Sequence, residues 1–473
     1  MWTERKYIVN HDVIVFYDSS VWVLMIQIFI LGLALLAGNI IRTRVPGLRR
    51  FLIPSALLGG LVIVVLKFIP GFSSLVNVEI MQMITYHCLG LGFVAISLKE
   101  TERSRKVPAV KIVENGCMTG ATYILQGITG VAISLVLYRI FGTFYSAGYI
   151  LPMGFGQGPG SALSWGAIYE AEYGFAGGAS FGLTVASIGF AVASVVGVVY
   201  MNIQISKGRI IPRKDEGHTK SVEDFEKRDE IPTSESIDRF SMQIVLVIIS
   251  YAGAYGIMNL ISASGIKALQ DLAWGLNFLW AIIAAYILKI IMKRLKAAGT
   301  VKRGYVNNYL LDRFGGFMFD LMIIAGVASI RFEDVRINWL AIVLMCTAAS
   351  AVTFIYVRSI TKHLYRGYEN EMFLCNFGML TGTVSNGMIL LREIDPNYRT
   401  PAASNQVMQN FPAILFAAPC LLLMGTAASS LRACLIVLGI FTVLFASYTI
   451  FLFRRKVFRK RYQDKQDYEW KES

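Results

Sequence analysis

The segment from Leu151 to Gly166 holds the residue types most able to form a binding site. Its centre, Gly154 to Gly160, contains four glycines, one proline and one amide side chain, and long apolar stretches flank it. Neither a helix nor a strand runs easily through that composition. Within hydrocarbon, non-helical backbone occurs only where protein buries it or where it lines a wet cavity. The composition therefore predicts a broken element that binds an ion or a solute.

Polar side chains in this first segment could contact a ligand. The amide of Gln157 can both donate and accept hydrogen bonds, and its glycine neighbours allow close approach. Ser161 and Ser164 begin the returning arm, where a helix start would direct free N–H groups at an anion. The alternatives are an amide that satisfies loop carbonyls and serines that bond to their own helix. The candidate residues are Gly156, Gln157, Gly158, Gly160, Ser161 and Ser164.

A second interrupted segment, residues 373–391, carries neutral oxygens beside glycines. Carbonyl and hydroxyl oxygens suit a hard cation such as sodium, although ordinary turn chemistry is the alternative. The candidate residues are Asn376, Gly378, Thr381, Gly382 and Thr383.

Asp320 is a carboxylate inside an apolar stretch. Such a group costs on the order of 2.5–3.5 kcal/mol on insertion scales and should face protein or water. Together with Asn376 and Thr381 it is a candidate sodium ligand. A proton carrier and a structural hydrogen-bond partner are the alternatives. Gln126 and Asn410 are polar residues within spans that could pack against the interrupted segments.

The elements that must position these residues are membrane spans. The chain has 473 residues, of which 55% are hydrophobic and 16% charged, against roughly 25% charged in soluble proteins. Eleven windows approach the ~20 mostly apolar residues that cross a bilayer. These predicted spans are Val21–Ile41, Phe51–Ile69, Ile80–Leu98, Cys117–Phe141, Gly177–Ile203, Met242–Ile261, Trp274–Ile291, Phe314–Ile330, Trp339–Val357, Val407–Met424 and Leu431–Leu452.

The net charge of +14 does not indicate nucleic-acid binding, because the basic residues lie in short loops between apolar spans. Every second loop is basic, which is the pattern of positive-inside sorting. That pattern places the N-terminus outside and the C-terminus in the cytoplasm of a multi-pass plasma-membrane protein. The six cysteines have no CxxC spacing, so neither a zinc site nor a disulfide framework is indicated.

The order of elements predicts two repeats of opposite orientation. Residues 206–238 form a hydrophilic linker between two sets of five spans, each set with one interrupted segment read as a re-entrant hairpin. An odd number of spans inverts the second set, which is the architecture of many secondary transporters. The predicted parts are an extracellular segment 1–20, a first repeat 21–205 with a hairpin near 148–169, the cytoplasmic linker 206–238, a second repeat 239–425 with a hairpin near 373–391, an extra transmembrane helix 426–453 and a basic cytoplasmic tail 454–473. The fold class is thus an all-α polytopic membrane protein.

Three passages resemble the bacterial sodium–glutamate symporter family. Residues 53–61, Ile-Pro-Ser-Ala-Leu-Leu-Gly-Gly-Leu, are similar to a pattern of its second span. Residues 156–162 followed by 173–175 resemble its first re-entrant loop, and residues 376–383 lie where its second belongs. The resemblance covers residues 21–425 and implies a divergent member with an extra C-terminal span.

The resemblance implies sodium-coupled symport of glutamate or a related small acidic solute by alternating access, with sodium as coupling ion, no other cofactor, and no enzymatic activity. A carrier of another organic anion coupled to H⁺ or Na⁺ is the alternative. A membrane enzyme would need acid–base or metal constellations, whereas the four histidines are scattered and no HExxH motif occurs. A channel and a homodimer stay open. The expected partners are the solute, sodium and the lipid bilayer, without nucleic acid.

Overall fold

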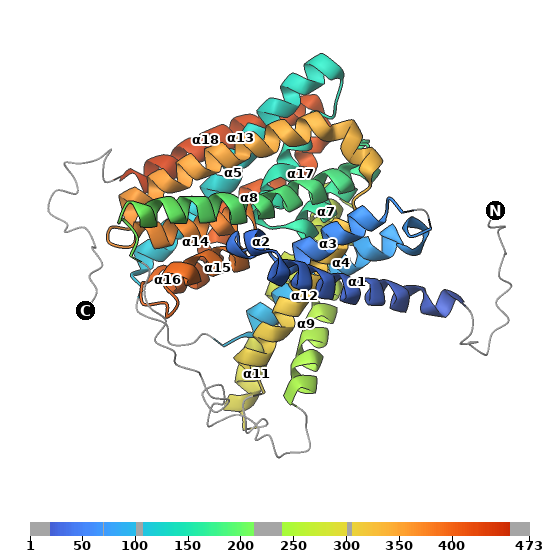
Figure 1. Ribbon diagram of the computed structural model, residues 1–473, viewed down its shortest axis with the longest axis horizontal. Coiled ribbons are helices and arrows are strands. Elements are labelled where there is room, and N and C mark those ends of the chain that lie inside the picture. The colour runs from blue at the N-terminus through green and yellow to red at the C-terminus, as the bar shows by residue number, and fades with distance from the viewer. Residues whose placement is uncertain (1–18, 70, 101–106, 212–238, 300–304, 455–473) are drawn as a thin grey trace.

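The regular elements are helices throughout the computed structural model, which describes residues 19–69, 71–100, 107–211, 239–299 and 305–454 (Figure 1). The expected N-terminal segment 1–20, the linker 206–238 and the basic tail 454–473 lie largely outside these residues. Within them, eight helices are long and apolar enough to cross a membrane, or nine if one bent pair counts as a span. The chain is therefore an all-α polytopic membrane protein, as the sequence predicts.

The helices of the first half, up to the linker, follow the predicted order. Two short 3-10 helices lie among them, Ser73–Leu75 and Ala147–Ile150. The α-helices are α1 (Ser19–Arg44), α2 (Pro46–Arg50), α3 (Ser55–Leu66), α4 (Val78–Leu98), α5 (Ala109–Phe141), α6 (Leu151–Gly156), α7 (Pro159–Tyr173) and α8 (Gly178–Ser206).

The second half ends with two long helices. Its helices are α9 (Arg239–Ser262), α10 (Lys267–Gly275), α11 (Asn277–Ala297), α12 (Asn308–Ala328), α13 (Phe332–Leu364), α14 (Glu369–Thr381), α15 (Val384–Ile394), α16 (Ala402–Met408), α17 (Asn410–Ser429) and α18 (Leu431–Leu452). The inverted relation between the halves stays a prediction.

Three predicted spans differ from the helices observed. The span Phe314–Ile330 lies largely in α12, which is not among the eight described helices that are long and apolar enough to cross a membrane. The span Phe51–Ile69 is only the 12-residue helix α3, because Pro54 biases Ile53 away from helical backbone and the helix already ends at Leu66. The span Trp274–Ile291 belongs to a broken pair, α10 and α11, bent by 72°. The hydropathy of this apolar run does not show where the helix is broken, so the bend could not be predicted from it.

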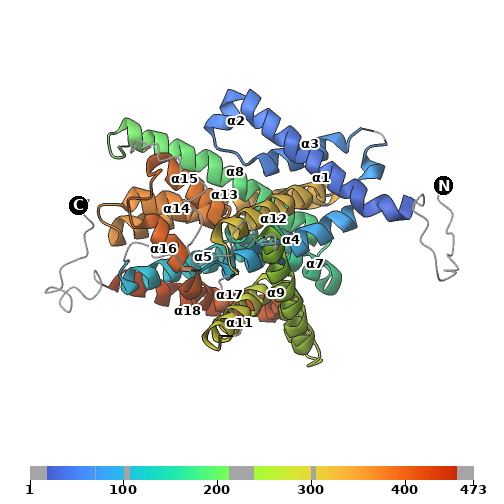
Figure 2. The same cartoon turned by 90° about the horizontal axis from the view of Figure 1, so that it is seen from below.

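Helix α5 is the centre of the larger half of the molecule. It contacts α6, α13, α14, α16, α17 and α18, and Figures 1 and 2 show α13 and α18 running beside it. Helices α9 and α11 pack on α4 instead and extend away from the rest (Figure 2). The main apolar core therefore surrounds α5, with a smaller cluster under α9 and α11.

Contacts among helix ends and the segments that connect them sort these parts onto two sides. On one side Lys99 pairs with Asp312 at 2.7 Å, and Lys111 donates to the carbonyl of Leu364 at 2.5 Å. Loops of the other predicted side also meet, for example where the Tyr145 hydroxyl donates to the Ala428 carbonyl at 2.8 Å. The grouping agrees with the alternation of basic and non-basic loops.

Candidate functional site

The first glycine-rich segment folds into a hairpin of α6 and α7. Backbone N–H groups of Gln157 and Gly158 both donate to the carbonyl of Met153, which ends α6, and Gly158 has φ 92°. That left-handed value favours glycine. At the open end, the ring of Phe144 lies 5.6 Å from that of Tyr169. Because entry and exit of the segment meet, the chain turns back at Gln157–Gly158.

The second segment folds into a hairpin of α14 and α15. A Cβ on Gly378 would lie 2.7 Å from Gly387 Cα, so only glycine allows the two arms to approach this closely. The chain turns at Gly382 and Thr383, between the two helices. Both interrupted segments are thus helical hairpins with glycines at the turn or between the arms.

The tips of the two hairpins touch. A Cβ placed on Gly158 would lie 3.3 Å from Thr383 Cγ2. Helix α8 runs against both tips, because a Cβ on its Gly189 would lie 2.5 Å from the Thr381 carbonyl oxygen and 3.3 Å from Phe155. Two segments more than 200 residues apart in the sequence therefore form one junction.

Helix α5 bonds to both tips. The hydroxyl of Tyr123 donates to the carbonyl of Gly156 at 2.8 Å. One turn later, Gln126 Nε2 donates to the carbonyl of Leu380 at 2.9 Å and to Thr353 Oγ1 at 2.9 Å. Gln126 thus packs against a hairpin, as its position suggested. Tyr123 was not anticipated, since an aromatic residue in an apolar span gives no signal of a hydroxyl contact.

Several polar atoms at this junction have no hydrogen-bond partner among the described residues. They are Gln157 Oε1, Ser161 Oγ and Asn386 Nδ2. Helices α7 and α15 both begin at the tips, so their free N–H groups and positive dipole ends lie there as well. Such groups stabilise negative charge. The junction can therefore hold an anionic group without a basic side chain.

The other candidates of the first hairpin serve packing. Gly160 admits the side chain of Leu89, which a Cβ would meet at 2.7 Å. Ser164 donates to the Gly160 carbonyl at 2.9 Å, which is the alternative of a serine bonded to its own helix. The glycine and this serine thus shape the hairpin rather than expose free groups.

The candidates outside the first hairpin are divided. Thr381 donates to the carbonyl of Phe377 at 2.7 Å within α14. Asn376 Nδ2 donates to the carbonyl of Met372 at 2.9 Å, and its Oδ1 has no partner in the part of the chain that the structure describes. Asp320 is half-buried on α12 and lies six residues before Gly326. A Cβ built onto Gly326 would lie 3.1 Å from the Pro159 side chain of the first hairpin. The structure therefore places Asp320 about 9 Å along the helix from the first tip.

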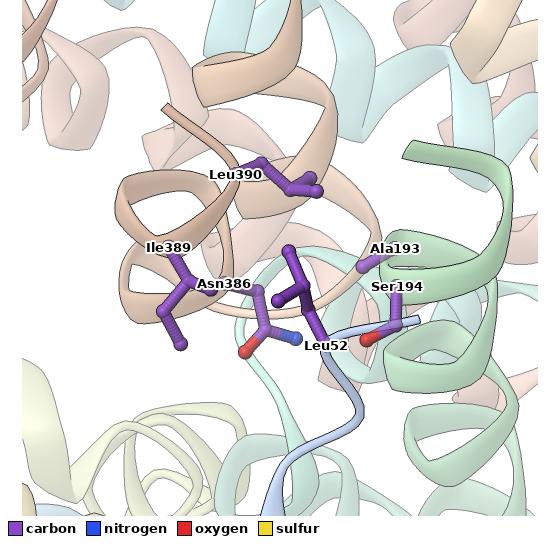
Figure 3. A pocket seen from close by; sticks show the side chains of 6 residues that line it. All are labelled: Leu52, Ala193, Ser194, Asn386, Ile389 and Leu390. Carbon is purple, nitrogen blue, oxygen red and sulfur yellow. The ribbon is translucent and has the colours of Figure 1, made fainter. Parts of the chain in front are cut away.

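A small cavity lies beside the second tip (Figure 3). Leu52, Ala193, Ser194, Asn386, Ile389 and Leu390 line it, and its volume of about 10 Å³ is room for roughly one water molecule. Leu52, in the connection before α3, has φ 54° and lies between α8 and α15 in Figure 3. Left-handed backbone is uncommon for such a residue, so packing of the leucine holds the connection in place.

Comparison with known proteins gives the family. A family model described as sodium/glutamate symporter matches residues 23–399. No curated protein sequence matches the chain. The matched range takes in both hairpins, their meeting point at Gly158 and Thr383, and the helices α5 and α8 that hold the tips. The chain belongs to the sodium/glutamate symporter family.

Proposed function

We propose that the protein imports glutamate or a related small acidic solute together with sodium by alternating access. Membership of a symporter family supports transport of a solute with sodium. The observation that carries the proposal is the contact of Gly158 with Thr383, which joins two hairpin tips inside a membrane protein. Secondary transporters bind their substrates where such discontinuous helices meet.

The solute binds at this junction through its carboxylates. Helices α7 and α15 each present an N-terminus there, one from either hairpin. A dicarboxylic amino acid can place one carboxylate at each, and Ser161 and Asn386 supply unpartnered polar atoms for further hydrogen bonds. This arrangement explains recognition of an acidic solute at the tips by N–H groups and neutral side chains.

Binding requires the helices around the tips to separate. Ligand pockets usually have volumes of roughly 300–1,000 Å³, whereas the cavity beside Asn386 holds about 10 Å³. The Leu52 connection lies on that cavity, so its movement away from α8 and α15 opens a route to the second tip. Separation of the helices around the first hairpin opens a route to the junction from the other side of the membrane.

The protein is oriented in the plasma membrane with its N-terminus outside. The basic-loop alternation supports this orientation, and the observed grouping of loops onto two sides agrees with it. In this orientation the first hairpin opens outward and the second opens to the cytoplasm.

The test is uptake into proteoliposomes. Radiolabelled glutamate, aspartate and other dicarboxylates are supplied with an inward sodium gradient, a proton gradient, or neither. Uptake above equilibrium that needs sodium supports the proposal. Accumulation driven by protons alone, and lost in Asp320→Asn, would instead make this chain a proton-coupled carrier. Flux that never exceeds equilibrium under any gradient would indicate a channel.

A further inference from the structure

A buried group of amide side chains lies where α5, α14 and α16 meet. Each of its members is at most 1% exposed, and no charged side chain belongs to it. We call it the amide cluster; its members are Asn115, Asn376, Asn405, Gln406 and Gln409.

Hydrogen bonds fix how α5 and the segment of α16 and α17 meet. Asn405 Nδ2 donates to the backbone carbonyl of Lys111 at 3.4 Å, and Thr119 donates to Gln409 Oε1 at 3.0 Å. Lys111, Asn115 and Thr119 are spaced by four residues and so share one face of α5. Asn115 therefore lies between the two bonded positions, opposite residues 405–409.

Helix α14 closes the cluster from its third side. The side-chain nitrogens of Gln406 and Gln409 both donate to Met379 Sδ, the latter at 3.4 Å. Asn376 precedes Met379 by three residues and shares its face of α14. Sulfur is a weak acceptor. These contacts engage the amide nitrogens of the two glutamines with Met379 and do not involve their oxygens.

Four buried amide oxygens of the cluster have no hydrogen-bond partner among the described residues. They are Asn115 Oδ1, Asn376 Oδ1, Asn405 Oδ1 and Gln406 Oε1. The corresponding nitrogens of Asn376, Asn405 and Gln406 are engaged, whereas Asn115 Nδ2 also has no partner among the described residues. The cluster thus has four unpartnered oxygens and one unpartnered amide nitrogen. A buried unsatisfied acceptor is unfavourable, and an excess of oxygens over donors is the composition that a hard cation requires.

The geometry points to a binding site for a monovalent hard cation, sodium, formed by the oxygens of Asn115, Asn376, Asn405 and Gln406. The donor set is uncharged, whereas divalent sites use carboxylates. On α5, Lys111 pairs with Glu114 at 3.1 Å, a carboxylate that it shares with Arg454. Asn405 and Gln406 follow residue 399, where the match to the family ends, so part of this site lies outside the matched region.

Such a site would couple sodium binding to solute binding at the second hairpin tip. Asn376 precedes Thr381 by five residues, about 7.5 Å along α14. A cation shared by α5, α14 and α16 fixes the arm that ends at the second tip. This inference rests on the proposed sodium-coupled function, in which sodium binding favours the tip arrangement that accepts the solute.

The test measures sodium binding without solute. Thermal unfolding of the purified protein is followed while NaCl replaces choline chloride, since a ligand of the folded state raises Tm. Asn115→Leu and Asn405→Leu should raise the half-effective sodium concentration about tenfold or more. The matched control is Asn277→Leu on α11, also a fully buried amide with an unpartnered oxygen, which should leave that concentration unchanged.

A charged variant keeps the inference testable if the leucine variants do not fold. Asn115→Asp adds a negative ligand and should lower the half-effective sodium concentration. Folded leucine variants with the response of the parent protein, or an aspartate variant with no gain, would mean that the amide cluster holds only water. If the parent protein shows no sodium response and takes up glutamate without sodium, the proposed sodium coupling fails as well. Failure of the site alone is thus distinguished from failure of the proposed function.

Discussion

Tyr123 and Gln126 lie one turn apart on α5, and each donates a buried hydrogen bond to the tip of a different hairpin. The backbone carbonyls that accept them, Gly156 and Leu380, are at the ends of α6 and α14. One face of a single helix thus fixes the positions of both tips. A displacement of α5 relative to either hairpin must break at least one of these bonds.

Gln126→Leu should lower both stability and uptake. It removes the donor to the buried carbonyl of Leu380, and an unsatisfied buried acceptor costs about 1–3 kcal/mol. The control is Thr353→Val, because the Gln126 amide still serves Leu380 when the threonine hydroxyl is absent. Thermal unfolding and initial uptake rates of both variants check this. Equal effects of the two variants would show that the bond to Leu380 has no special weight.

Gly158→Ala should reduce uptake more than Gly142→Ala. Both glycines have positive φ, but Gly142 has ordinary left-handed backbone (φ 67°, ψ 21°), whereas Gly158 (φ 92°, ψ −170°) lies in a region that essentially only glycine adopts, so the backbone strain is also larger at Gly158. Only at Gly158 does the new Cβ meet another tip, at 3.3 Å from Thr383 Cγ2, whereas Gly142 faces open space.

The double variant Gly158→Ala/Thr383→Ser removes the methyl group that the new Cβ would meet. Uptake rates, each normalised to the amount of folded protein, should recover part of the loss. No recovery would attribute the defect to the backbone of Gly158 alone. Gly158→Val should be the most severe of the series, because a β-branched residue is the least compatible with positive φ.

The sequence predicted the hairpins better than the bonds that hold them. Glycines marked the interrupted segments near 148–169 and 373–391, because glycine adopts backbone conformations that other residues rarely do, and Pro159 added a helix-breaking residue in the first. The partners of the tips could not be read in this way. Tyr123 uses a terminal hydroxyl to reach a backbone carbonyl, and no hydropathy pattern records which carbonyl lacks a partner.

The amide cluster was also beyond sequence reasoning. Asn376 was a candidate because it lies beside glycines, but Asn115 lies within a helix and Asn405 in a short helix that hydropathy does not resolve. Their proximity depends on the packing of α5, α14 and α16. Conversely, Thr381 and Ser164 looked equally suited to a ligand, yet each bonds to its own helix.

Glu114→Gln should lower stability strongly. Its carboxylate is fully buried and pairs with Lys111 at 3.1 Å and with Arg454 at 2.6 Å. Removing one partner of a buried ion pair costs about 3–5 kcal/mol. Arg454→Gln should cost less, because Lys111 still pairs with the carboxylate.

The double variant of Glu114 and Arg454 should be less damaging than the sum of the single ones, as coupled residues require. Denaturation in detergent measures all three. Additive losses would show that the two residues do not act as a pair.

The orientation can be checked by cysteine labelling. In a background without the six native cysteines, Thr219→Cys in the linker should react with a membrane-impermeant reagent only from the cytoplasmic face. Ser429→Cys, at the exposed C-terminal residue of α17, should react only from outside. The reverse result would invert the assignment of both sides and of the two hairpins.

The pairing of Arg454 with Glu114 has a consequence for biosynthesis. Helix α18 follows the other described helices in the chain. Arg454, two residues after it, pairs with Glu114 on α5, and the hydroxyl of Tyr149, in the 3-10 helix that follows α5, donates to the backbone carbonyl of Cys434 on α18 at 3.0 Å. While the ribosome is still making α18, the carboxylate on α5 lacks one of its two cationic partners. This ion pair can therefore form only after Arg454 has been synthesised, and a product that terminates before residue 454 keeps the buried Glu114 carboxylate with Lys111 as its remaining partner.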